Sequence, residues 1–74
     1  MPNVEFKIIE ELSVISESRS GRRKELNLIS WNNGDPVYDL RTWYKGHGKP
    51  QRGITLSADE VRELQEALSW LDLN

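Results

Sequence analysis

The segment Tyr38–Leu56, with the sequence YDLRTWYKGHGKPQRGITL, decides the fold that we predict for this chain. Its beginning, from Val37 to Lys45, is rich in β-branched and aromatic residues, which favour a strand. The glycine- and proline-containing stretch KGHGKPQRG favours a loop, and the run Ile54–Leu56 favours a second, short strand. The segment therefore predicts two strands joined by a basic loop.

Two further strands are predicted upstream of this segment. From Val4 to Val14 apolar residues occupy alternate positions with one flaw, which predicts a long strand with one buried face. SESRSGRRK then indicates a turn, and alternation resumes from Glu25 to Trp31. NNGDP indicates the next turn, because Asn and Gly tolerate positive φ. We expect strands at about 4–17, 23–32, 37–45 and 52–56.

A well-marked helix is predicted after the fourth strand, over about residues 58–72. Ser57 and Glu60 have the spacing of a capping box. Val61 and the leucines that follow it at helical spacing form a stripe that can cover the sheet, so we interpret it as core or dimer contact. Trp70 lies away from the centre of this stripe, where a partner helix would cover it. The sequence thus predicts one α+β domain, residues 1–74, with an antiparallel sheet and the order β-β-β-β-α.

The small size of the chain predicts self-association. Below about 80 residues a single core seldom provides more than a few kcal/mol of stability. The 74 residues include no cysteine and one histidine, which excludes disulfides and argues against a structural metal site. The N-terminal sequence MPNVEFKIIEEL does not resemble a signal peptide, and no run of eighteen apolar residues occurs. We therefore expect a cytoplasmic oligomer without a cofactor.

Charges are segregated along the chain, although the formal net charge is only −2. Residues 19–52 contain eight of the ten Lys and Arg residues but three of the twelve acids, so this part carries +5 and the remainder −7. Such segregation predicts a basic surface and an acidic surface if the two parts fold onto different faces. The alternative is a solvated face that binds no ligand.

The basic part also interleaves cations with aromatic residues. In a strand Arg41, Trp43 and Lys45 share one face, and Trp31 can lie on the same face of the neighbouring strand. Such a face suits single-stranded nucleic acid, because bases stack on the rings and phosphates attract the cations. Two alternatives stay open: Arg41 can pair with Asp39, and Trp31 or Trp43 can belong to the core.

Four neighbouring residues have structural interpretations. We assign Tyr38 and Leu40 to the core, and we expect Gly53 to serve a bend or bulge. His47, between two glycines, is predicted to be a solvated loop residue. These positions therefore add nothing to the predicted binding surface.

The order of these motifs resembles that of a known family. NLISWNNG, then YDLRTWY, a basic loop, RGITLS and an acidic capped helix resemble the transcriptional positive cofactor four family, and within it the small bacterial members called YdbC-like. The resemblance covers about residues 22–71. It implies a whirly-like homodimer with curved sheets that binds single-stranded DNA with little sequence preference, its helices forming the dimer contact.

The resemblance also implies roles for individual residues. Arg41 matches an arginine that contacts phosphates, and either Trp43 or Tyr44 matches a base-stacking position. The full set of predicted nucleic-acid-binding residues is Arg22, Arg23, Lys24, Trp31, Arg41, Trp43, Tyr44, Lys45, Lys49 and Arg52. The predicted dimer contacts are Leu64, Leu68, Trp70 and Leu71.

Catalysis is not expected. The single histidine has no identifiable partner for a nucleophilic triad, and most acids lie on the helix or the first strand rather than converging on one site. The leading hypothesis is a single-stranded-DNA-binding homodimer that supports transcription, replication or repair. The alternatives are a protein-interaction module that contacts the transcription machinery through its acidic helix, and a binder of single-stranded RNA.

Overall fold

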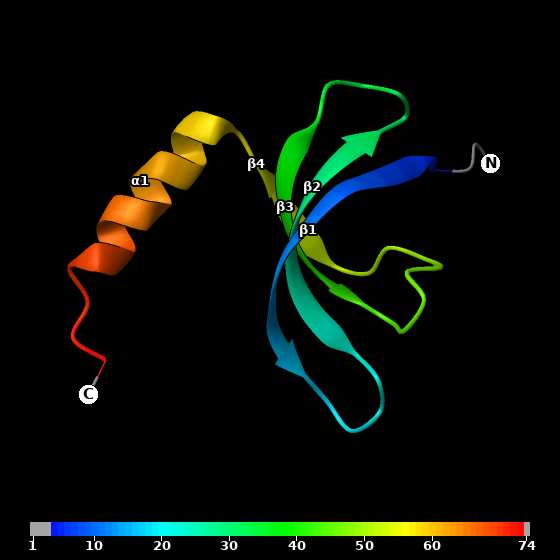
Figure 1. Ribbon diagram of the computed structural model, residues 1–74, viewed down its shortest axis with the longest axis horizontal. Helices are drawn as coiled ribbons and strands as arrows, with labels where there is room; N and C mark the ends of the chain where they lie inside the picture. Colours follow the sequence, from blue (N-terminus) through cyan, green and yellow to red (C-terminus); the bar gives the residue numbers. More distant parts are fainter. Residues whose placement is uncertain (1–3, 74) are drawn as a thin grey trace.

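The computed structural model describes residues 4–73, which form one antiparallel sheet and one helix. The elements are β1 (Phe6–Glu17), β2 (Arg23–Trp31), β3 (Val37–Trp43), β4 (Gly53–Leu56) and α1 (Ala58–Ser69). The strands pair in the order β1-β2-β3-β4, and Figure 1 shows a strongly curved sheet with α1 standing to one side of it. The predicted α+β class and β-β-β-β-α order are confirmed.

Two glycines shape the loop between β3 and β4. β3 ends at Trp43, two residues before the predicted end, because the chain then turns: His47 N donates to Tyr44 O at 3.1 Å. Gly46 adopts a φ of 89° in this turn, which glycine tolerates without strain. Gly53 pairs with Arg41 so closely that a Cβ on Gly53 would lie 2.2 Å from the Arg41 Cβ. Glycine is therefore required where β4 begins.

β1 does not keep the simple alternation that the sequence predicts. Its pairing with β2 shifts between Ile8 and Glu10, between Glu11 and Ser13, and again between Val14 and Ser16. Each shift adds a residue to one strand, which bends the strand and moves the residues after the shift to the opposite face. The flaw in the sequence pattern lies at the first shift, and its consequence is that Glu11 faces the same side as Asn27 of β2.

The core lies on the concave face, the inner side of the curved sheet that contains Ile29 and Trp43. Both side chains are fully buried. Phe6 packs between the two tryptophans of this face, its ring centroid 5.2 Å from Trp43 and 5.8 Å from Trp31. Trp43 therefore has the core position that the sequence left open as an alternative, and no face of its ring is accessible to a base.

Three polar side chains are as deeply buried on the concave face as the apolar ones. They are Glu25, Asn27 and Asp39, and each is at most 1% exposed. They share this face because Glu25 pairs with Arg41 and Asn27 pairs with Asp39 across β2 and β3. Tyr38 and Leu40, which the sequence assigns to the core, lie on the outer face and stay partly exposed.

The capping box of α1 is present as predicted. Ser57 Oγ accepts from Glu60 N at 3.1 Å, and Glu60 Oε1 accepts from Ser57 N at 2.8 Å. These two hydrogen bonds satisfy backbone amides that have no partner within the helix, and they fix where the helix begins.

The apolar stripe of α1 does not cover the sheet of the same chain, so the core role, one of the two interpretations of this stripe, is not observed. Among the described residues of the helix none is buried, and Val61 is the most enclosed. The predicted dimer contacts are all exposed: Leu64 (40%), Leu68 (53%), Trp70 (81%) and Leu71 (55%). The helix therefore leaves an apolar surface without a partner in the single chain, a feature typical of protein contacts.

Within residues 4–73, no helix has the length and apolar character needed to span a bilayer.

Candidate nucleic-acid interface

Two basic segments meet at one end of the sheet. Arg23 at the start of β2 pairs with Trp43 at the end of β3, so the β1–β2 turn and the β3–β4 loop leave the sheet together. The loop returns beside β3, where Thr42 N donates to Arg52 O at 3.1 Å. We call this region the basic end, and its exposed cations include Arg22, Lys24, Lys45, Lys49 and Arg52.

Tyr44 gives the basic end an accessible aromatic ring. It follows the buried Trp43 directly, and 47% of its surface is exposed. Lys45 is its neighbour in sequence, and Lys49 lies in the same loop. Of the two aromatic residues that the sequence proposes for base stacking, Tyr44 is thus the one whose ring a base can reach.

Arg41 lies on the concave face and is already held by protein groups. Its Nε and Nη2 donate to the two carboxylate oxygens of Asp39, both at 2.8 Å. Its Nη1 donates to Gln51 O at 2.7 Å, and the guanidinium lies 4.9 Å from the centre of the Trp31 ring. The alternative pairing of Arg41 with Asp39 is therefore observed, in a buried rather than a surface setting. Arg41 joins β3 to the loop before β4 and keeps 15% of its side chain exposed.

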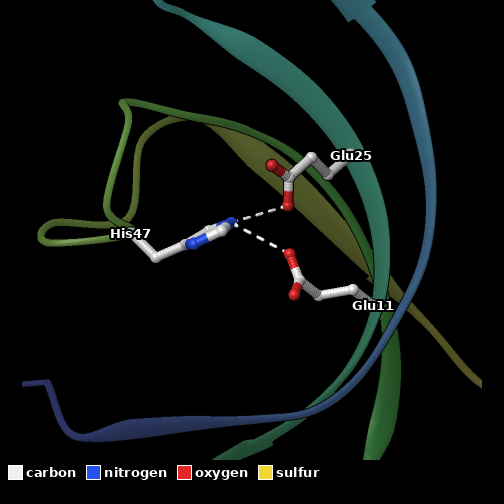
Figure 2. A group of neighbouring side chains, drawn as sticks. All are labelled: Glu11, Glu25 and His47. Carbon is white, nitrogen blue, oxygen red and sulfur yellow. Dashed lines mark hydrogen bonds and ion pairs between the residues drawn. The ribbon is translucent and has the colours of Figure 1, made fainter.

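His47 is not the solvated loop residue that the sequence predicts. Its Nε2 lies 2.8 Å from Glu25 Oε1 and 3.8 Å from Glu11 Oε1. Figure 2 shows the imidazole pointing toward both carboxylates. Its ring meets the Trp43 ring edge-on at a centroid distance of 5.2 Å. The β3–β4 loop therefore folds back, so that His47 covers part of the core and reaches the buried carboxylate of β2.

The buried Glu25 is held in its ionised form by these contacts. Burial opposes ionisation and on its own would raise the pKa of Glu25 above the ordinary value of 4.5. Hydrogen bonds from Asn27 and His47, with the charges of His47 and Arg23, outweigh burial and leave the pKa of Glu25 lowered. Asn27 Nδ2 donates to Glu25 Oε1 at 3.0 Å, and Arg23 Nε lies 3.5 Å from Oε2.

This lowered pKa predicts a loss of stability in acid. Because the folded state holds Glu25 ionised more strongly than the unfolded chain does, the stabilisation is complete above the unfolded pKa near 4.5. It is then lost as the pH falls through the lower folded-state pKa. Urea denaturation at a series of pH values should show this decline, and Glu25→Gln should flatten it. An equally steep decline in the Glu25→Gln protein would contradict the assignment.

The structure divides the predicted nucleic-acid-binding residues among three places. The basic end contains Arg22, Lys24, Tyr44, Lys45, Lys49 and Arg52. Trp31, Arg41 and the core residue Trp43 lie on the concave face. Arg23 is partly buried between Glu17, 4.0 Å away, and Glu25.

The sequence interpretation missed the polar network of Glu25, Asn27 and His47. A signal was present for two of them, because Glu25 and Asn27 are in phase with the buried Ile29 along one strand. No comparable signal marks His47, whose contacts with Glu25 and Glu11 are made 22 and 36 residues away along the chain.

Comparisons with known proteins give matches that cover both the basic end and most of the concave face. A family model described as "Transcriptional Coactivator p15 (PC4)" matches residues 18–67, from the β1–β2 turn to α1. An uncharacterized protein of Treponema pallidum (strain Nichols) is 30% identical over 69 residues, which cover 93% of this chain and 81% of that protein. The matched segment includes every residue of the basic end, Trp31 and Arg41.

Proposed function

Because the chain belongs to the PC4 family of transcriptional coactivators, whose members bind single-stranded DNA, we propose that it binds single-stranded DNA through its basic end and acts as a homodimer. The binding is expected to be independent of sequence and to support transcription, replication or repair. A cytoplasmic location is part of the proposal, because that is where a bacterial chromosome exposes single strands. The family is one of non-enzymatic cofactors, and we propose no catalytic activity.

One observation supports this proposal above the others: an exposed ring among exposed cations at the basic end. Tyr44 is 47% exposed and Lys45 follows it, while Arg22, Lys49 and Arg52 lie in the segments that meet there. Stacking of a base on an aromatic ring contributes roughly 1–3 kcal/mol and tolerates any base, since every base has a flat face. The cations attract phosphates regardless of sequence.

Duplex DNA fits the described residues less well. Reading a major groove requires a helix or a two-stranded ribbon that enters it. α1 carries Asp59 and Glu60 in its first turn and Glu63 and Glu66 beyond, so phosphates would repel it. Single strands are therefore the expected substrate.

The homodimer is proposed from the apolar surface of α1. Leu64, Leu68 and Leu71 share the stripe that the sheet of the same chain leaves exposed. A second copy offers an equivalent stripe, and a twofold contact pairs like surfaces without an additional partner. Two basic ends on one dimer would also raise the affinity for a strand long enough to reach both.

Fluorescence anisotropy with a labelled oligo-dT at two salt concentrations tests the proposal. We expect micromolar or tighter binding that weakens as salt rises, since each neutralised phosphate releases counterions. Duplex DNA and single-stranded RNA of the same length serve as comparisons. Absence of oligo-dT binding at low salt would refute the proposed function.

Substitutions at Tyr44 locate the binding surface. Tyr44→Ala should cost roughly 1–3 kcal/mol of binding free energy if its ring stacks on a base. Tyr44→Phe keeps the ring and should bind like the unchanged protein, and both variants should remain folded because the side chain is half exposed. Equal affinities for Tyr44→Ala and Tyr44→Phe would remove stacking from the mechanism.

A second candidate function rests on the acidic outer surface of α1. Its exposed acids and leucines would suit a basic, partly apolar protein surface, such as a component of the transcription machinery. This protein-interaction module predicts no oligo-dT binding, so the anisotropy experiment separates it from the first. Tight binding to RNA but weak binding to oligo-dT would instead favour a single-stranded RNA binder.

A further inference from the structure

The concave face gathers three potential metal ligands from three separate parts of the chain. Glu11 belongs to β1, Glu25 to β2 and His47 to the β3–β4 loop, and Figure 2 shows their side chains converging. One ligand atom from each lies within 4.8 Å of the other two. We propose that these residues bind one divalent first-row transition-metal ion, with Zn²⁺ as the probe.

The spacing of the three groups suits such an ion. Zn²⁺ binds imidazole nitrogen and carboxylate oxygen at about 2.0–2.2 Å, so neighbouring ligand atoms around it lie roughly 3–3.5 Å apart. His47 Nε2 lies 2.8 Å from Glu25 Oε1 and 3.8 Å from Glu11 Oε1, which brackets that separation. The Glu11 side chain is 63% exposed and free to adjust. Small side-chain movements would therefore bring the three ligand atoms to the separations that one bound ion requires.

A buried acceptor without a donor gives a second, independent indication. Asn27 Oδ1 is enclosed and accepts no hydrogen bond from the described residues, while Glu25 Oε2 is enclosed with its ion-pair partner Arg23 Nε 3.5 Å away. Both side chains are 1% exposed, and both line a hollow that also contains Glu11. A buried acceptor without a donor is costly, and a bound ion or water commonly explains one. A cation in this hollow beside Glu25 would give Asn27 Oδ1 a partner.

The local charge also permits a divalent ion. Two carboxylates and a neutral imidazole carry −2, and the Arg23 guanidinium, 3.5 Å from Glu25 Oε2, offsets one of these charges. A mixture of one imidazole and two carboxylates suits Zn²⁺ and its first-row neighbours better than Ca²⁺ or Mg²⁺, which prefer oxygen alone. The site is therefore expected to discriminate between these classes of ion.

Ion binding would fasten the β3–β4 loop to the sheet. His47 has a φ of 54° next to Gly46, so this part of the loop adopts a conformation that needs support. The loop also carries Tyr44, Lys45 and Lys49. An ion shared by His47, Glu11 and Glu25 would hold the loop against both β1 and β2.

Calorimetric titration of the metal-free full chain with Zn²⁺ tests the proposal without any nucleic acid. We expect one ion per chain with micromolar affinity, weakened at least about tenfold by His47→Gln and by Glu11→Gln. Glu10→Gln is the matched control, because Glu10 neighbours Glu11 but pairs with Leu28 and faces the other side. Glu11 is the informative carboxylate, since its side chain is exposed, whereas Glu25 also contacts Asn27 and Arg23, so its replacement would change more than the ion site.

Nuclear magnetic resonance of the single histidine provides the second measurement. Zn²⁺ should shift the ¹⁵N signal of His47 Nε2, and Ca²⁺ at equal concentration should not. The proposal is overturned if His47→Gln and Glu11→Gln bind Zn²⁺ like the unchanged protein, or if the imidazole signal does not move. Because neither readout involves DNA, failure here leaves the proposed function standing.

Discussion

Replacing Trp43 with alanine is expected to lower the free energy of unfolding by about 3–5 kcal/mol, because the change leaves a large cavity in the core. The ring is fully buried, with the Phe6 ring 5.2 Å away on one side and the His47 ring meeting it edge-on. A domain of this size has a total stability of similar magnitude, about 0.05–0.15 kcal/mol per residue. Trp43→Ala should therefore lose a large part of the stability of the fold, which urea denaturation followed by circular dichroism would measure.

The neighbouring aromatic residue supplies the control for this experiment. Tyr44 is 47% exposed, so Tyr44→Ala should change the free energy of unfolding by no more than about 0.5 kcal/mol. One residue along the chain thus separates a substitution that strongly destabilises the fold from one that affects the proposed DNA binding. A Trp43→Ala protein as stable as the Tyr44→Ala protein would contradict the buried position of Trp43.

Features encoded by residues close in sequence were predicted correctly. The capping box depends on Ser57 and Glu60, three residues apart, and both of its hydrogen bonds form. The turn at NNGDP also follows from local preferences, since Asn32 and Asn33 adopt φ values of 50° and 62°. Such signals survive folding because they depend little on the rest of the molecule.

The faces of the sheet were harder to predict, because they depend on pairing between strands. The shifts along β1 bring Glu11 to the concave face, which strict alternation from Phe6 and Ile8 does not predict. The interpretation of β3 placed Asp39, Arg41 and Trp43 on one face correctly, but it added Lys45, which lies beyond the end of the strand, and it took that face to be open. Curvature of the sheet encloses it instead, and this buries Trp43 and Asp39.

Of the candidate site, the sequence predicted the residues whose position depends on surface exposure alone. Lys45, Lys49 and Arg52 lie in a loop, and loops stay near the surface. The pairing of His47 with Glu25 could not be predicted, because it requires the loop to fold back over the core. Long-range contacts of this kind leave no pattern in a single sequence.

Replacing Leu68 with aspartate is expected to dissociate the proposed homodimer. Leu68 lies in the exposed stripe of α1 and is 53% exposed in the single chain. Burying an unpaired carboxylate and losing an apolar contact at an interface costs at least about 2 kcal/mol, and a twofold dimer contains the change twice. The dissociation constant should therefore rise roughly 10²–10³-fold. Sedimentation equilibrium of both proteins over a range of concentrations measures this change.

The melting temperature of Leu68→Asp also distinguishes a dimer from a monomer, because the substitution is expected to have different effects in the two states. In a monomer the half-exposed Leu68 side chain contributes little, so Leu68→Asp would be nearly neutral. In a dimer, folding and association are linked, and the melting temperature of the unchanged protein should rise with protein concentration, while that of Leu68→Asp should not. Glu66→Asp places an aspartate on the opposite side of the same helix and controls for the low helix propensity of aspartate. If Leu68→Asp and Glu66→Asp melt alike at every concentration, the stripe of α1 is no dimer contact.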